Sequence, residues 1–240
     1  MIDFDDGLRA RIAANLALHD RVEIPLDGRR HAAVAILLVD SVMGSDRIDP
    51  FGATAEDLSV IPSDVSDLDG RMADVAGGAS FVLCRRSAGL NRHASQWALP
   101  GGRLDGGESA IDAALRETDE EIGVRVGDDS VLGLLDDYAT RSGYVITPVV
   151  VWGGPDVEIV PHPDEVLAAY RIGLHELTRD DSPRFVTIPE SDRPVVQVPL
   201  GGDLIHAPTG ALLVQFRWVA LDGRINERVA DFEQPVFAWG

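Results

Sequence analysis

The residues that could do chemistry gather in one stretch of the chain, GRLDGGESAIDAALRETDEEIGV, residues 102–124. Ser109, with Asp112 three residues later, is typical of a helix start, and Gly123 is typical of a helix end. A mostly apolar stripe between them could face a core and consists of Ile111, Leu115, Thr118 and Ile122. The stretch therefore predicts a loop followed by one amphipathic helix.

Three carboxylates share another face of this predicted helix. Glu117, Glu120 and Glu121 are spaced three and four residues apart near the C-terminal end. The helix macrodipole disfavours negative charge there by about 0.3–1 kcal/mol for each exposed group. Arg116 supplies one cation against several anions. Because hard divalent cations such as Mg²⁺ bind carboxylate oxygens, we expect a metal site; the alternative is a solvated acidic face.

The same residues resemble the Nudix box, G-x5-E-x7-R-E-U-x-E-E-x-G-U, in which U is an aliphatic residue. Its fixed positions are matched by Gly102, Glu108, Arg116, Glu117, Glu120, Glu121, Gly123 and Val124. Thr118 stands where an aliphatic residue is usual. The resemblance implies an α/β fold, an α/β/α sandwich with a mixed β-sheet. It also implies hydrolysis of a nucleoside diphosphate linked to another group, with Mg²⁺ or Mn²⁺ as cofactor.

The resemblance further implies a role for each residue of the box. The implied metal ligands are the Gly102 carbonyl, Glu117, Glu120 and Glu121. The implied catalytic group is Glu120 as the leading general base, Arg116, which holds it, and Glu108, which pairs with Arg116.

Residues 82–102, VLCRRSAGLNRHASQWALPGG, are similar to an additional motif of the coenzyme A pyrophosphatase branch of this family. Asn91 stands where that motif has Arg, and Ser95 stands where it has Gly. Residues 134–138, 142–150 and 163–166 also resemble that branch. The implied substrate is coenzyme A or acyl-coenzyme A, cleaved to adenosine 3′,5′-bisphosphate and 4′-phosphopantetheine. The residues expected to bind it are Arg86, Ser87, Arg92 and Gly101.

Two other functions remain open at this point. One is a Nudix hydrolase of ADP-ribose, another nucleotide sugar or a dinucleotide. The other is a non-catalytic Nudix-fold ligand sensor, although a sensor has no need of all three helix carboxylates. Outside the box, Trp97 and Tyr144 are interpreted as core aromatics rather than base-stacking platforms, and Glu165 as a carboxylate at a strand edge rather than a further acid of the site.

The composition restricts the partners and the compartment. The 240 residues carry a formal net charge of −19, which repels nucleic acid and anionic membranes. The chain has no lysine, so a permanent cation that binds phosphate must be an arginine. The charged start lacks the apolar region of a signal peptide, and Cys84 is alone. We expect a cytoplasmic protein with a small-molecule nucleotide substrate, as a monomer or a homodimer.

The hydrophobic pattern predicts one domain over residues 1–240. Its core spans about 31–225 and is interrupted by a polar insertion at about 41–79 that is rich in Asp. A helix capped by Thr209 is expected to end near Gly223, and the tail after it is expected to dock. The other expected elements are a helix within 7–19, strands at 31–39, 81–84, 97–99 and 165–172, and two hairpins, 131–152 and 184–198.

Overall fold

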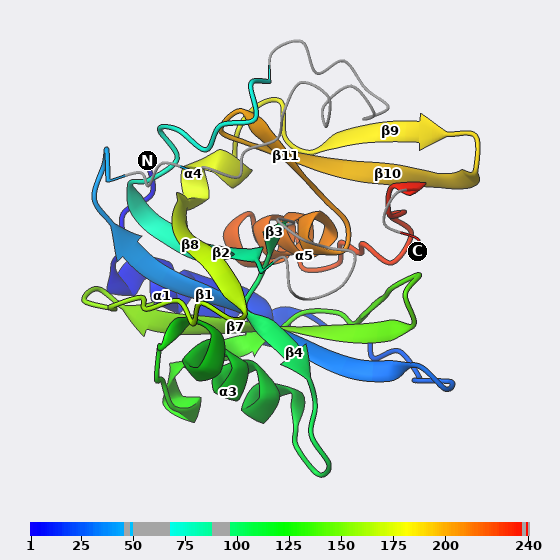
Figure 1. Cartoon of the computed structure of the whole chain (residues 1–240), viewed down its shortest axis with the longest axis horizontal. Helices are drawn as coiled ribbons and strands as arrows, with labels where there is room; N and C mark the ends of the chain where they lie inside the picture. Colours follow the sequence, from blue (N-terminus) through cyan, green and yellow to red (C-terminus); the bar gives the residue numbers. More distant parts are fainter. Residues whose placement is uncertain (46–48, 50–67, 88–96, 237–238, 240) are drawn as a thin grey trace.

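A computed structural model describes residues 1–45, 49, 68–87, 97–236 and 239 of the chain. Its centre is a mixed sheet (Figure 1). β1 (Arg30–Ser41) pairs antiparallel with β2 (Gly78–Arg86) and parallel with β7 (Tyr144–Gly154). The apolar run of β1 is buried on both faces of the sheet, as predicted for a central strand.

Five further strands complete this sheet, which has eight strands among the described residues. β4 (Gly101–Arg103) pairs with the first half of β1, and β8 (Val166–Gly173) pairs with β2. The other three are β3 (Trp97–Ala98), β5 (Val131–Leu134) and β6 (Tyr138–Ala139). A short 3-10 helix, η1 (Asp128–Ser130), precedes β5.

Helices cover both faces of the sheet, which confirms the predicted α/β/α sandwich. α3 (Ala110–Ile122) packs on one face against β1, β4 and β7. The other face carries α1 (Asp6–Leu18), α5 (Thr209–Gln215) and a π-helical turn, η2 (Phe216–Leu221). Figure 1 shows α3 and α5 on opposite sides of β1. None of the described helices is long and apolar enough to span a membrane.

The C-terminal third forms a second, three-stranded antiparallel sheet of β9 (Arg184–Ile188), β10 (Ser191–Leu200) and β11 (Asp203–His206). The sequence predicts the first two strands as a hairpin but does not predict the third. A short helix, α4 (Leu174–Leu177), leads into this sheet. The residue that precedes α5 is Pro208, so the expected cap by Thr209 is wrong: Thr209 is the first residue of the helix, and its hydroxyl donates to the Trp97 carbonyl.

The polar insertion predicted over 41–79 lies largely outside the described residues. Its C-terminal end is described and contributes Met72, Val75 and Ala76 to the hydrophobic core. Asp49, also within it, accepts hydrogen bonds from the buried Arg85 guanidinium, at 2.6 Å, and from the Tyr170 hydroxyl. These parts of the insertion are therefore packed, although the composition predicts an insertion that is not part of the core.

Candidate metal centre

The helix that carries the acidic residues begins and ends as its sequence predicts. The Asp112 backbone N–H donates to the Ser109 hydroxyl, and the Ser109 N–H donates to the Asp112 carboxylate at 3.0 Å. Gly123 adopts φ 70° at the C-terminal end, a left-handed conformation that glycine reaches without strain. These two caps set the limits of α3.

The buried side of α3 includes the predicted stripe, which packs against the core, and extends beyond it. Ile122 and Thr118 are fully buried, but Ile111 and Leu115 are only half-buried. The helix also rests on the sheet through two small residues, Ala113 and Ala114. The Thr118 hydroxyl donates to the Ala114 carbonyl at 2.7 Å, so its polar group is satisfied within the helix. The consequence is a close approach between α3 and the sheet.

Arg116 holds the acidic residues around it in place. Its Nε donates to Glu108 at 2.8 Å, and one terminal nitrogen donates to both Glu117 at 2.9 Å and Glu120 at 2.8 Å. The other terminal nitrogen donates to the Arg103 carbonyl at 3.0 Å. The hydrogen bond from Arg116 lowers the pKa of Glu108. Arg116 thus links the loop before α3 to two carboxylates on the helix.

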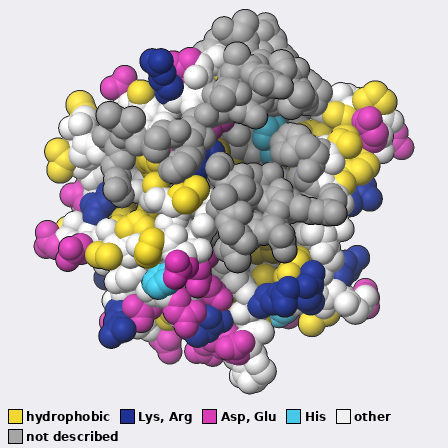
Figure 2. All heavy atoms as spheres, in the orientation of Figure 1, with side chains coloured by type: hydrophobic (Ala, Val, Ile, Leu, Met, Phe, Trp, Pro, Cys, Tyr) yellow, Lys and Arg dark blue, Asp and Glu magenta, His cyan; other side chains and the backbone are white. Residues whose placement is uncertain are grey.

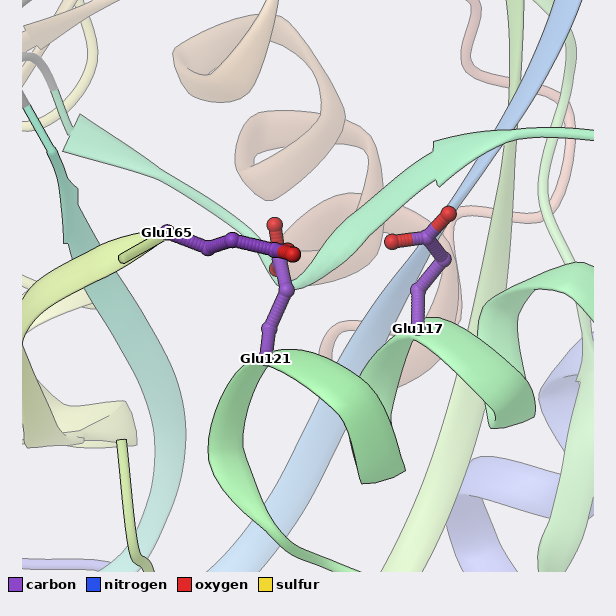
Figure 3. A group of neighbouring side chains, drawn as sticks. All are labelled: Glu117, Glu121 and Glu165. Carbon is purple, nitrogen blue, oxygen red and sulfur yellow. The ribbon is translucent and has the colours of Figure 1, made fainter. Parts of the chain in front are cut away.

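Three carboxylates converge at the edge of the sheet, as Figure 3 shows. Glu117, Glu121 and Glu165 each offer one oxygen, and these oxygens all lie within 4.8 Å of one another. Glu121 is only 6% exposed, and its carboxylate accepts a hydrogen bond from the Gly101 N–H at 3.0 Å. Burial raises its pKa to about 7, and burial also raises the pKa of Glu117. Because burial disfavours the ionised form of these two carboxyls, a bound cation that neutralises their charge would stabilise the site.

Glu120 does not belong to this group among the described residues, although the sequence predicts it as a metal ligand. Its side chain is 55% exposed and is bound to Arg116. The physical reason is its position on α3: Glu120 faces solvent, whereas Glu117 and Glu121 face the sheet. Glu165, interpreted from the sequence as a strand-edge carboxylate, takes the third place in the group.

Glu165 reaches the helix because the chain before β8 caps the end of α3. The Val160 N–H donates to the Ile122 carbonyl at 2.9 Å, and the His162 N–H donates to the Glu121 carbonyl at 2.8 Å. The Ser87 N–H then donates to the Glu165 carbonyl at 2.9 Å. The sequence signal that could have found Glu165 is the match at 163–166, which precedes the strand.

Two glycines bring backbone next to the carboxylates. A Cβ at Gly102 would lie 2.2 Å from the nearer Glu117 oxygen, so only glycine leaves this carboxylate in place. Gly101 has φ 155°, and a Cβ there would lie 2.3 Å from the Ala33 carbonyl oxygen. The carboxylate oxygens at this point are those that Mg²⁺ and Mn²⁺ prefer, and no thiolate or imidazole belongs to the group. The residues present therefore fit a hard divalent cation.

A model of the NUDIX domain family matches residues 72–191, which is half of the chain. The chain belongs to the Nudix family. A protein of Pectobacterium atrosepticum named uncharacterized Nudix hydrolase NudL is 39% identical over 98 residues, 40% of this chain and 51% of that protein. Its namesake in Escherichia coli K12 is 40% identical over 95 residues, 39% of this chain and 50% of that protein. The chain thus spans about half the length of the curated relatives that it matches.

A solved structure is similar in fold to this Nudix chain. The crystal structure of a MutT/nudix family protein from Enterococcus faecalis matches with a TM-score of 0.51 and 17% sequence identity. The match covers 81% of this chain and 62% of the other. It agrees with the arrangement of a mixed sheet between helices.

Three of the residues predicted to bind substrate precede the Nudix helix in the chain and are described, and the fourth lies outside the described residues. Arg86 is half-buried at the end of β2, where its charge counteracts the rise in the Glu121 pKa. Ser87 contacts Glu165 through its backbone, and Gly101 contacts Glu121 through its backbone. Arg92 lies outside the described residues.

The two aromatic residues considered from the sequence differ in environment. Trp97 is buried, as predicted: the Arg85 guanidinium lies 3.6 Å from its ring centroid, and its indole N–H donates to Asp203. Tyr144 is only half-buried and is contacted by two exposed arginines, Arg30 and Arg103. The interpretation of Tyr144 as a core aromatic is therefore wrong.

Proposed function

We propose that this protein hydrolyses a diphosphate bond in a nucleotide derivative, with Mg²⁺ or Mn²⁺ as cofactor. The observation that carries the proposal is the convergence of Glu117, Glu121 and Glu165 beside Gly101 and Gly102, at the Nudix box of a Nudix-family chain. A ligand sensor does not require three carboxylates, two of them with raised pKa, at one point.

Each residue of the site then has a defined task. Glu117, Glu121 and Glu165 hold the cation, which when bound neutralises diphosphate oxygens and lowers the pKa of a water molecule. The Gly101 N–H fixes the orientation of Glu121. Arg116 fixes Glu117 and balances part of the negative charge.

Glu120 is our proposed general base, because it faces solvent and Arg116 orients it at 2.8 Å. Glu165 is the alternative base, because its carboxylate belongs to the group with Glu117 and Glu121. The two assignments differ in one measurable respect, since Glu165 also holds the cation in our proposal. Glu120→Gln should lower kcat with an unchanged dependence on metal concentration, whereas Glu165→Gln should shift that dependence.

For the substrate we propose coenzyme A or a related compound. Arg86 and Ser87 support it, because the chain bearing them reaches the carboxylate group through the Ser87–Glu165 hydrogen bond. The match at 134–138 carries less weight, since Asp136 and Asp137 already bind the chain before β1. Asp136 accepts from the Val22 N–H at 2.8 Å, and Asp137 accepts from the Ile24 N–H at 3.0 Å.

The deciding experiment is mass spectrometry of products from coenzyme A, dephospho-coenzyme A, ADP-ribose and a dinucleoside polyphosphate. Reactions in ¹⁸O-labelled water should place one label in one of the two phosphate products, and EDTA should abolish the reaction. Glu121→Gln serves as the inactive control. Binding without product from any compound would refute the enzyme, and efficient cleavage of ADP-ribose alone would refute the coenzyme A assignment.

A further inference from the structure

We infer that Arg30, Arg103 and Tyr144 form a binding site for a phosphate monoester on the part of the substrate that lies away from the scissile diphosphate. The link to catalysis depends on the proposed function, but the binding of the phosphate does not. The site would accept the anion of a nucleoside 3′-phosphate or a chemically equivalent group.

The register of three strands places these side chains together. Arg30 is directly opposite Tyr144 in the β1–β7 pair, and Arg103 is opposite Ala32 in the β1–β4 pair. Side chains two residues apart on a strand, as at Arg30 and Ala32, lie on the same face. All three side chains therefore leave the sheet on the face opposite α3.

The contacts between them are specific. The Arg30 guanidinium carbon lies 4.2 Å from the centroid of the Tyr144 ring, and that of Arg103 lies 5.6 Å from it. Arg103 also donates from Nε at 3.0 Å and from a terminal nitrogen at 2.8 Å to the Tyr144 hydroxyl oxygen. Because this oxygen accepts both bonds, the phenolic hydrogen is directed elsewhere and can donate to a ligand.

The charge of this group is not neutralised by its described surroundings. Neither Arg30 nor Arg103 forms an ion pair with any residue that the structure describes, and both are exposed. Arg116, in contrast, contacts three carboxylates. Two unpaired guanidinium groups on one ring, in a chain of net charge −19, offer only hydrogen-bond donors. Planar guanidinium donors are suited to the oxygens of a phosphate dianion.

The site lies next to the metal centre in the chain. Arg103 follows Gly102, the residue packed against Glu117, and its carbonyl accepts from Arg116. Figure 2 shows basic side chains over the ends of β1 and β4, beside the acidic side chains over α3. The two groups lie on opposite faces of β4, since Gly102 is packed against Glu117 and the side chain of the next residue, Arg103, leaves the strand on the other face.

Calorimetric titration of adenosine 3′,5′-bisphosphate and of AMP tests this site directly. We expect wild-type protein to bind the bisphosphate more tightly, and Arg30→Gln and Arg103→Gln each to reduce that preference about tenfold to a hundredfold. AMP affinity should change little. Arg29→Gln is the matched control, since it removes the same charge from an exposed neighbouring residue. Thermal melting verifies that each variant is folded.

Kinetic measurements distinguish a failure of the phosphate site from a failure of the proposed reaction. The ratio of kcat/KM for coenzyme A to that for dephospho-coenzyme A should fall in Arg30→Gln and Arg103→Gln but not in Arg29→Gln. An unchanged preference in both variants, or an equal loss for both ligands, overturns the site even if hydrolysis is efficient. An arginine-dependent preference in calorimetry supports the site even if no diphosphate is cleaved, and in that case only the proposed function fails.

Discussion

Replacing Glu121 by Gln should stabilise the metal-free protein at neutral and alkaline pH. The pKa of this buried carboxyl rises from an ordinary value of 4.5 to about 7 in the folded state, mainly because of burial. A folded state that favours the protonated acid is stabilised fully below pH 4.5, and this stabilisation is lost as the pH rises to about 7. The difference corresponds to about 3 kcal/mol. Gln carries no such charge, and its amide oxygen can still accept from the Gly101 N–H.

The measurement is thermal or urea unfolding of both proteins in EDTA at pH 5 and pH 8. At pH 8 the variant should be more stable by up to about 3 kcal/mol, or roughly 2–4 °C in Tm for each kcal/mol in a chain of this size. At pH 5 the two should differ much less. Adding Mg²⁺ at pH 8 should raise the Tm of the wild type more than that of the variant, because the cation binds the folded state of the wild type. In the same preparations, kcat of the variant should fall by orders of magnitude.

Glu120→Gln is the control for this prediction. It removes the same charge from the same helix, but from a side chain that is 55% exposed instead of buried. It should therefore show no stabilisation that grows between pH 5 and pH 8. A difference between wild type and Glu121→Gln that is independent of pH, or a Mg²⁺ effect equal in both proteins, would refute the argument.

Three further outcomes follow from other contacts. Glu165→Gln should lower turnover at least about a hundredfold and raise the metal concentration for half-maximal rate, whereas the exposed neighbour substitution Asp164→Asn should do neither. Gly102→Ala should abolish most activity with little change in Tm, because its Cβ displaces the flexible end of Glu117, and a wild-type rate would contradict this. For Glu233, burial is outweighed by hydrogen bonds led by Arg141 that lower its pKa to about 2. Its stabilising contribution of about 3 kcal/mol, present above pH 4.5, is therefore lost as the pH falls through 2, and urea unfolding of Glu233→Gln against wild type at pH 7 and pH 2.5 should show the gap closing.

The local geometry of the site could be predicted from the sequence because helix spacing relates residues three and four apart. That rule brings Arg116 next to Glu120 and places Glu117 near Glu121, and the structure agrees. The same holds for the helix limits at Ser109 and Gly123. How far the buried side of α3 extends did not follow from spacing alone, since small residues at 113 and 114 allow the helix to approach the sheet more closely than a Leu or Ile stripe would.

The place of Glu165 in the carboxylate group did not follow from helix spacing, because it depends on pairing between distant strands. β8 pairs with β2 in one register up to Arg85 opposite Ala168, and then shifts so that Arg86 is opposite Val166. The extra residue, Leu167, forms a bulge, and a bulge changes the face to which the preceding residues point. Val166 accordingly packs with Ala169 in the core beneath α3, although the two residues are three positions apart. In an unbroken strand, residues that share a face are separated by an even number of positions.

The residues that match the coenzyme A branch differ in what they contact, so they do not support that substrate equally. Asp136 and Asp137 direct their carboxylates to the chain before β1, and Asp137 also accepts from Arg21 and from the Thr147 hydroxyl, at 2.7 and 2.6 Å. A carboxylate satisfied in this way within the protein has little capacity left for a ligand. The residues that can distinguish one diphosphate substrate from another are those with unused donors near the metal centre. Among the described residues, Arg86, Arg30 and Arg103 form no ion pair, and of these three only Arg86 belongs to the motif that suggested coenzyme A.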